Sequence, residues 1–395
     1  MNVYADNAAT TRMSQAAVDA MLPFLRESYG NPSSLYTLGQ KAAESLQASR
    51  ETMAKYLGCD AREITFTSGG SEADNQALLT AATLGARKGK KHIISTAFEH
   101  HAILHSLKRL EKQGFEVTLL DVHENGLVTA QQVADAIRED TCLVTVMYAN
   151  NEIGTIQPIA EIGAVCRERG VLFHTDAVQA AGHLPINVRE QNIDMLSLSA
   201  HKFHGPKGVG LLYARKGIFL TNLIEGGAQE RGKRAGTENV GGIAGMAAAF
   251  REACEHMDEN IAKVTALRDK LIDGLSIIPH CALNGDREHR LPGNVNFCFE
   301  GIEGESMLLL LDGKGICASS GSACTSGSLD PSHVLLAIGR PHEVAHGSLR
   351  LTLCESNTEA EIDHILACVP EIVAYLRGMS PVWRDLVEGK KSFIL

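Results

Sequence analysis

The first feature of the chain is a regular alternation of short apolar runs and longer amphipathic stretches between residues 60 and 214. Runs such as "EITFT", "HIIST" and "TCLVTVMYA" are short and rich in β-branched residues, which is typical of buried strands. The series continues with "VLFHTDA", "DMLSLSA" and "GVGLLYA". Strands that alternate with helices in this way predict an α/β fold with a mainly parallel sheet covered by helices on both faces.

The pattern changes in the second half of the chain. Thr237 to about Ile272 is rich in alanine and predicts one or two long helices, and Thr358 to about Arg377 predicts a closing helix. A chain of 395 residues is too long for one ordinary core. We therefore expect a large α/β domain over residues 15–260 and a small α+β domain formed by residues 1–14 and 261–395.

Composition narrows the class of protein. The formal net charge is −10 and no long Lys/Arg run is present, which argues against binding to nucleic acid, because that binding needs clustered positive charge. No apolar run is long enough to span a membrane, and the N-terminus has no leader pattern. The ten cysteines form no CxxC pair and several lie in apolar segments, as expected in a reducing compartment. We expect a cytoplasmic protein.

Candidate chemistry collects after the predicted strands, where ligands bind in open α/β sheets. After "EITFT", a glycine turn at Gly70 and Ser71 opens a helix whose N–H groups suit a phosphate. A plain helix cap by Ser71 explains this turn equally well. After "HIIST", His100 and His101 offer imidazoles that could stack on a planar ligand or carry a proton, although single histidines are commonly solvated caps.

The following strands end in a carboxylate and a lysine. Asn150 and Asn151 follow one strand, and Asp176 ends the next, with Gln179 close behind it. A buried carboxylate needs a cationic or hydrogen-bonded partner, and a protonated pyridine nitrogen is one. The last group consists of Ser199, His201 and Lys202. Burial turns a lysine into a nucleophile able to form a Schiff base, whereas a solvated loop lysine is the plain alternative. Together these groups match pyridoxal phosphate.

A cysteine in an unusual setting lies in "CASSGSACTSGSLDP", residues 317–331. The neighbours of Cys324 are small Ser, Gly, Ala and Thr residues that offer it no apolar packing. Structural cysteines are normally buried, whereas reactive ones lie in accessible settings. We therefore expect Cys324 to be an accessible thiol that carries a chemical group.

These motifs resemble those of the NifS/IscS-type cysteine desulfurases, a branch of the class V, fold-type I pyridoxal-phosphate enzymes. The likeness runs almost from end to end, through "YADNAATT", "TSGGSEADN", "HTDAVQAAG", "SAHKFHGPKG" and "SSGSACTSGSLDPSHVL". The resemblance implies a homodimer that converts L-cysteine to L-alanine. It also implies a persulfide on Cys324 and sulfur transfer to an acceptor protein such as a scaffold for iron–sulfur cluster assembly.

The resemblance also implies a role for each matching residue. Lys202 would form the Schiff base with the cofactor, His100 would stack on its ring, and Asp176 would pair with the pyridine nitrogen. Arg350 in "GSLRLTL" would hold the substrate carboxylate, a bidentate task suited to guanidinium. The further implied contacts are the ring's phenolic oxygen for Gln179, ring and substrate for Asn151, the phosphate for Gly70, Ser71, Ser199 and His201, and the second subunit's phosphate for Thr237.

The chain departs from the family pattern in three places. The family often has His at Tyr36, Arg at Lys233 and Gly-Arg at Cys354-Glu355. The first two changes concern substrate or phosphate contacts. The third concerns local packing or the docking of a partner.

Three other functions compete with this interpretation. "PHEVAHG" fits the HExxH pattern of a zinc hydrolase, with His342 and His346 as ligands and Glu343 as base. That site needs a helix, but Pro341 and Gly347 leave room for hardly one turn, and no third ligand is evident. An aminotransferase or lyase of the same fold would have no use for Cys324. A non-catalytic sulfur scaffold would not need the lysine and carboxylate set.

Overall fold

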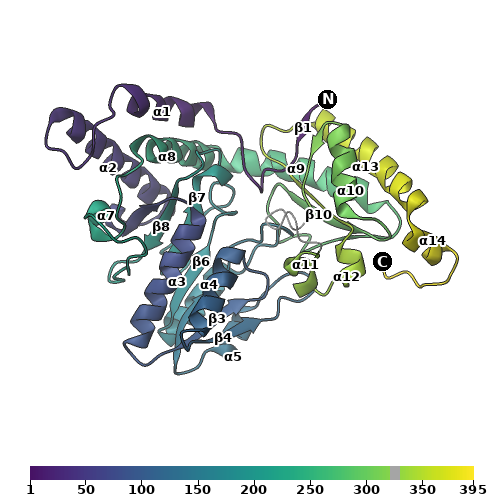
Figure 1. Cartoon of the computed structure of the whole chain (residues 1–395), viewed down its shortest axis with the longest axis horizontal. Coiled ribbons are helices and arrows are strands. Elements are labelled where there is room, and N and C mark those ends of the chain that lie inside the picture. Colours follow the sequence, from purple (N-terminus) through teal and green to yellow (C-terminus); the bar gives the residue numbers. More distant parts are fainter. Residues whose placement is uncertain (321–329) are drawn as a thin grey trace.

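A seven-stranded sheet forms the centre of the larger part of the molecule (Figure 1). The computed structural model describes residues 1–320 and 330–395, so Cys324 lies outside the described residues. The strand order is β2-β8-β7-β6-β5-β3-β4, and β8 runs antiparallel to both of its neighbours, whereas the other pairs are parallel. The strands are β2 (Ile64–Thr67), β3 (His92–Thr96), β4 (Glu116–Leu120), β5 (Thr141–Thr145), β6 (Leu172–Asp176), β7 (Met195–Ser199) and β8 (Gly210–Ala214). The predicted α/β fold with a mainly parallel sheet is confirmed.

Helices cover both faces of this sheet because consecutive strand residues point to opposite sides. Ile93 packs with α3 and α4 on one face, and Ile94 belongs to the core that includes α2, α6 and α8 on the other. Both residues are fully buried, which explains why these strands are apolar throughout. The helices of this part are α1 (Gln15–Arg26), α2 (Thr37–Leu57), α3 (Gly70–Ala86), α4 (His101–Glu111), α5 (Ala130–Ala136), α6 (Ile159–Arg169), α7 (Gln229–Gly232) and α8 (Val240–Glu255), with short 3-10 turns at Ala61–Glu63 and Ala200–Lys202.

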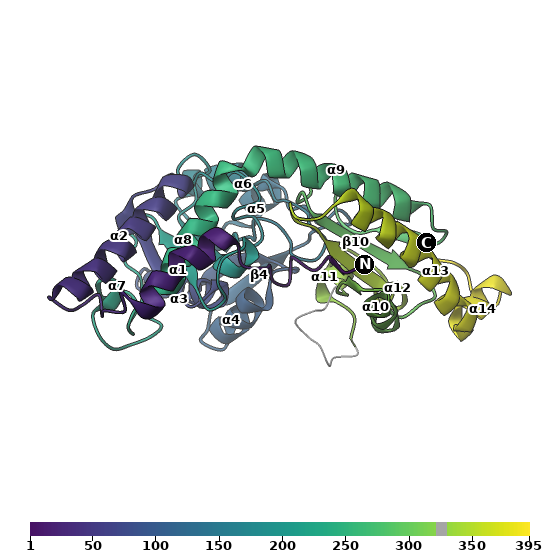
Figure 2. The same ribbon diagram turned by 90° about the horizontal axis from the view of Figure 1, so that it is seen from above.

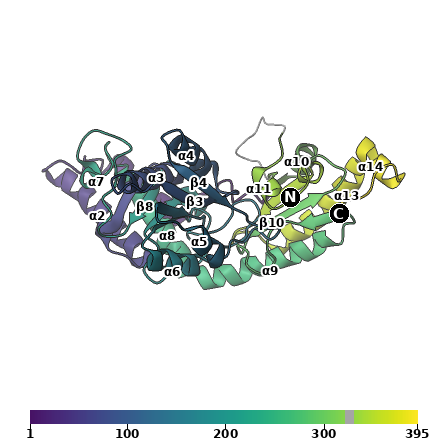
Figure 3. The same ribbon diagram turned by 90° about the horizontal axis from the view of Figure 1, so that it is seen from below.

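The helix α9 (Met257–Ser276) connects the larger part to a smaller one, as Figures 2 and 3 show. The smaller part contains an antiparallel sheet of order β12-β10-β9 and a parallel pair of β1 and β11. Its elements are β1 (Val3–Tyr4), β9 (Cys281–Leu283), β10 (Asn294–Phe299), α10 (Gly304–Gly313), β11 (Ile316–Cys317), α11 (His333–Ala337), α12 (His342–Ala345), β12 (Ser348–Thr352), α13 (Glu359–Met379) and α14 (Pro381–Val387).

The two ends of the chain meet in the core of the smaller part. Val3 and Ala5 are buried there with side chains from residues 264–376. Val334 and Ala345, which the expected boundary assigns to the small domain, belong to the core of the larger part. The division at residue 260 therefore stays a prediction.

The helix boundaries follow recognisable signals. The expected long helix from Thr237 consists of α8 and α9, and the closing helix is α13, whose capping residue Thr358 accepts a hydrogen bond from the Glu361 N–H. Within the described residues, no single helix has the length and apolar character to cross a membrane. The pair formed by α13 and α14 meets the criteria of length and composition together, with a bend of 85° between them.

Candidate active site at the carboxyl ends of the strands

Lys202 ends the 3-10 turn that follows β7. Its Nζ donates hydrogen bonds to the carbonyl oxygens of Ala8 and Ala9, at 2.6 and 2.9 Å. The Gln179 side chain donates to the same Ala8 oxygen at 3.0 Å. The N-terminal segment therefore orients two predicted site residues that lie more than 170 positions away from it in the chain.

Asp176 occupies the carboxyl end of β6 and is 5% exposed. One carboxylate oxygen accepts a hydrogen bond of 2.9 Å from the Val178 N–H. Burial raises the pKa of Asp176, and the nearby charges of His100 and Lys202 act in the opposite direction. The structure thus brings the three residues together, and a further cation against Asp176 would hold its carboxylate ionised.

His100 immediately precedes α4 and caps it. Its Nδ1 accepts a hydrogen bond of 3.1 Å from the Ala102 N–H, so a neutral ring carries its proton on Nε2. The predicted alternative, that His100 caps a helix, is therefore confirmed. The two roles are compatible, because the cap fixes the orientation of the ring and His100 lies near enough to Asp176 to lower the pKa of that carboxyl.

A cavity of about 460 Å³ lies at the start of α3. The helix is capped by Gly69 without any side-chain hydrogen bond, so the predicted alternative, a cap by Ser71, is wrong because Ser71 already lies inside the helix. Uncapped N–H groups at a helix start attract anions. A β-carbon at Gly70 would lie 2.6 Å from Val178 Cγ2, so a glycine is needed for the close packing here. The lining comprises Ala9, Thr10, Ser68, Gly69, Gly70, Ser71, Glu72, Ser199, His201, Lys207 and Gly208.

His201 lies in this cavity as a neutral ring. Burial, together with the charges of Lys202 and Lys207, lowers the pKa of His201 to about 4. Its Nδ1 lies 3.1 Å from the Thr10 hydroxyl. Sequence reasoning missed Thr10 and Lys207; the lysine in "GPKG", five residues after Lys202, was the available signal.

Thr237 is exposed and lies outside the cavity at α3. It lines a neighbouring cavity of about 140 Å³, which shares Ser68 and Gly208 with the first. The structure therefore does not place Thr237 against the phosphate cavity of its own chain.

Arg350 lies on β12 and is 2% exposed. Its Nη1 donates to the Asn151 carbonyl oxygen at 3.1 Å and its Nη2 to Asp6 Oδ1 at 3.0 Å. Its Nε is buried without a hydrogen-bond partner, and such a group is costly unless a ligand satisfies it. Ser319 pairs with Arg350 through two backbone hydrogen bonds of 2.6 and 3.1 Å. Ser319, which precedes Cys324 by five residues, therefore lies directly beside the strand that carries the guanidinium.

Glu99 directly precedes His100 in the chain and is fully buried. One carboxyl oxygen accepts hydrogen bonds from the Thr96 hydroxyl (2.8 Å) and the Met147 N–H (2.9 Å), while the other has no partner. Burial raises the pKa of Glu99 to about 8. The folded protein therefore keeps this carboxyl protonated at neutral pH.

We expect Glu99→Gln to flatten the dependence of stability on pH. Since the folded pKa of Glu99 exceeds the unfolded value, its contribution to stability is complete below about pH 4.5 and is lost as the pH rises through about 8. An amide does not ionise, so the variant should gain on the order of a few kcal/mol over wild type between pH 5 and 9. Urea unfolding at several pH values measures this. Parallel curves for wild type and Glu99→Gln would contradict it, and Glu111→Gln, on the exposed face of α4, is the control.

Two of the positions that depart from the family pattern, Tyr36 and Lys233, and the HExxH motif can be located in the structure. Tyr36 is exposed at the start of α2, and Lys233 Nζ donates to the Arg62 carbonyl oxygen at 3.2 Å. The HExxH motif forms only the four-residue helix α12. Within the described residues, neither His342 nor His346 belongs to a group of three side chains with metal-ligand spacing.

The residues at the strand ends fit pyridoxal phosphate. The uncapped start of α3 and its cavity suit the phosphate. The buried carboxylate of Asp176 suits a pyridinium nitrogen, and the Lys202 amine lies close enough to Asp176 to influence its pKa. The partnerless Nε of Arg350 suits a carboxylate of a bound amino acid.

Comparison with known proteins identifies the family. Residues 3–365 match the model of the family "Aminotransferase class-V". The chain is 54% identical over 393 residues to the cysteine desulfurase IscS of Clostridium botulinum strain Hall, and 99% of each chain is covered. A solved NifS-like protein superposes with a TM-score of 0.89 at 40% identity, covering 95% of this chain and 100% of the other. A structure described as SspA in complex with cysteine superposes with a TM-score of 0.79 at 36% identity, covering 90% and 100%. The chain is therefore a member of the class-V aminotransferase family, whose enzymes depend on pyridoxal phosphate.

Proposed function

We propose that this protein is a pyridoxal-phosphate-dependent cysteine desulfurase. It converts L-cysteine to L-alanine and keeps the sulfur as a persulfide on Cys324. The observation that carries the proposal is the pairing of Ser319, five residues before Cys324, with Arg350. Ser319 is bonded to the backbone of Arg350, whose buried guanidinium reaches Asn151 at the strand ends. The 54% identity to a protein named cysteine desulfurase supports the same activity.

The cofactor would be held by groups at four strand ends. Gly70, Ser71, Ser199 and His201 would hold its phosphate, and the neutral His201 would do so by hydrogen bonding rather than by charge. Lys202 would bind it covalently. His100 would stack on the ring, Gln179 would contact its phenolic oxygen, and Asp176 would keep its nitrogen protonated. The bound cofactor supplies an electron sink for charge that develops on the amino acid.

Substrate binding rests on Arg350 and Asn151. Arg350 would bind the carboxylate of L-cysteine with its partnerless Nε and a neighbouring N–H, because a planar guanidinium matches a carboxylate with two parallel hydrogen bonds. Asp6 and the Asn151 carbonyl oxygen hold the rest of the guanidinium in place. The cysteine in the structure of the similar SspA supports this choice of substrate.

The sulfur step balances without an external oxidant. The Cys324 thiolate attacks the sulfur of the substrate, the bond between Cβ and sulfur breaks, and a sulfur–sulfur bond forms on the enzyme. Lys202 and His100 would move the protons, so that the three-carbon product leaves as alanine. L-cysteine and an enzyme thiol thus give L-alanine and an enzyme persulfide.

Two finer features belong to the same proposal. Thr237 would contact the cofactor phosphate of a second subunit, since it is exposed and lies outside the phosphate cavity of its own chain. The active form would therefore be a homodimer. The persulfide would pass its sulfur to an acceptor protein, such as a scaffold for iron–sulfur cluster assembly, in the cytoplasm.

One experiment separates this function from that of an aminotransferase or lyase of the same fold. The purified protein is incubated with L-cysteine and a reductant, and sulfide and alanine are measured together. A desulfurase releases the two in equal amounts. A lyase would give pyruvate in place of alanine, and an aminotransferase would consume cysteine only with a keto acid present; either result would refute the proposal.

We expect Arg350→Lys to raise the KM for L-cysteine while kcat changes less. A lysine keeps the charge but loses the bidentate geometry, and a hydrogen bond to a charged group contributes about 1.5–3 kcal/mol, so KM should rise roughly 10- to 100-fold. Steady-state kinetics of sulfide release measures it. Arg189→Lys, in a half-exposed ion pair with Asp60, is the control. An unchanged KM would place the carboxylate site elsewhere.

A further inference from the structure

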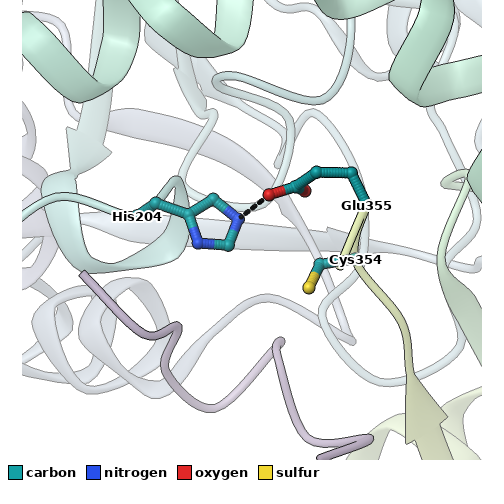
Figure 4. A group of neighbouring side chains, drawn as sticks. All are labelled: His204, Cys354 and Glu355. Carbon is teal, nitrogen blue, oxygen red and sulfur yellow. Dashed lines mark ion pairs between the residues drawn. The ribbon is translucent and has the colours of Figure 1, made fainter. Parts of the chain in front are cut away.

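A second group of reactive side chains lies where the two parts of the molecule meet. His204 follows Lys202 by two residues, and Cys354 and Glu355 follow the strand β12, which carries Arg350. The ligand atoms of His204, Cys354 and Glu355 lie within 4.8 Å of one another (Figure 4). All three residues line a cavity of about 1080 Å³, which is different from the cavity at the start of α3.

The imidazole of His204 is held with one nitrogen turned toward the other two side chains. Its Nδ1 lies 2.9 Å from the carbonyl oxygen of Arg12, and a carbonyl oxygen only accepts, so Nδ1 carries the proton. A histidine that binds a metal ion commonly donates its other N–H to a carbonyl oxygen in this way. Nε2 is buried without a hydrogen-bond partner and lies 3.2 Å from Glu355 Oε1.

The three ligand types and their spacing suit zinc. Imidazole nitrogen, thiolate sulfur and carboxylate oxygen are all common zinc ligands, whereas magnesium and calcium prefer oxygen alone. In a tetrahedral site, nitrogen and oxygen ligands about 2.0–2.1 Å from zinc are about 3.3 Å apart. The distance of 3.2 Å between His204 Nε2 and Glu355 Oε1 matches this value. A sulfur ligand needs about 3.6 Å, so the Cys354 thiol, which lies within 4.8 Å of the other two ligand atoms, has to approach by at most about 1.2 Å.

We propose that His204, Cys354 and Glu355 bind one zinc ion, with the fourth position open to water from the cavity. The site joins the segment after Lys202 to the segment after β12, and so links the two sides of the active site. Zinc bound there stabilises the folded protein, because the unfolded chain does not hold the three ligands together. The proposal does not depend on the sulfur chemistry.

The test uses the holoenzyme carrying Cys324→Ser, so that the thiol proposed to carry sulfur does not bind zinc. After treatment with a chelator, the protein is titrated with zinc chloride in a calorimeter, and zinc per chain is measured by mass spectrometry after gel filtration. We expect one zinc per chain with submicromolar affinity and a rise in the unfolding temperature. Magnesium chloride should give neither effect.

Substitution of the proposed ligands tests where the zinc ion binds. Cys354→Ser and His204→Asn should each weaken zinc binding more than about 100-fold, because loss of a ligand exceeds the 10- to 100-fold cost of losing an outer-shell partner. Cys317→Ser, which removes an exposed thiol on β11, should leave it unchanged. Cofactor absorbance and circular dichroism check that each variant is folded. The proposal is overturned if the parent protein retains no zinc, or if Cys354→Ser binds it as well as the parent.

Discussion

Cys324→Ser is expected to abolish sulfide release while the protein keeps its yellow cofactor colour and still changes its spectrum on binding L-cysteine. A serine hydroxyl is a far weaker nucleophile than a thiolate and forms no persulfide. The cofactor contacts proposed above involve other residues, such as Lys202 and Asp176, so binding should survive. The expected loss is therefore confined to the sulfur transfer step.

Mass spectrometry after a pulse of L-cysteine without reductant identifies the sulfur carrier. One added sulfur atom should appear on Cys324 and on no other cysteine. Cys317→Ser is the matched control, since this exposed thiol lies only seven residues earlier in the chain. Sulfide release at the wild-type rate by Cys324→Ser, or sulfur on a different cysteine, would contradict the proposed mechanism even with the cofactor in place.

Asp176→Ala should lower kcat for alanine formation by about 10²–10⁴-fold. The substitution removes the buried carboxylate of Asp176 from its proposed partner, the cofactor nitrogen. Breaking a buried ion pair by removing one partner costs about 3–5 kcal/mol. Asp176 is the carboxylate at the end of β6, and in the proposed role its loss would leave the cofactor nitrogen without the partner that keeps it protonated and able to accept electrons. Asp176→Glu keeps the charge and should lose much less. Rates are compared at full cofactor occupancy, judged by absorbance.

Asp74→Asn offers a matched control for this experiment. Asp74 is also buried, with its Oδ1 3.7 Å from His174 Nε2. Burial, together with the charge of Asp176, raises the pKa of Asp74 well above the usual range, so this neighbour of Asp176 is already uncharged. An asparagine keeps its shape and charge state, and we expect near wild-type turnover. If Asp176→Ala turned over at the wild-type rate, or if Asp74→Asn were equally impaired, Asp176 would have no special role.

The site residues that could be predicted from the sequence are those whose place in the fold follows from the order of strands and helices along the chain. Parallel strands connected by helices have their carboxyl ends at one edge of the sheet, so residues that follow these strands must lie near one another. Asp176 and Lys202 were predicted in this way, and the structure brings them together with His100. The alternative of a cap by Ser71 is wrong, because the residue at which a helix begins depends on backbone geometry as well as on residue type.

The sequence by itself determined which residues are candidates for the site. Local hydrophobic periodicity predicted the strands, and the polar residues that follow these strands, such as Asp176 and Lys202, were the candidates. Only the tertiary structure decided what holds them. Ala8 accepts hydrogen bonds from Gln179 and Lys202, and Asp6 binds Arg350, across separations of 171, 194 and 344 residues. Local periodicity carries no information about such contacts, because they arise when the N-terminal strand β1 joins β11 in the smaller part. The same holds for the juxtaposition of His204 with Glu355, which depends on how the two parts of the molecule pack.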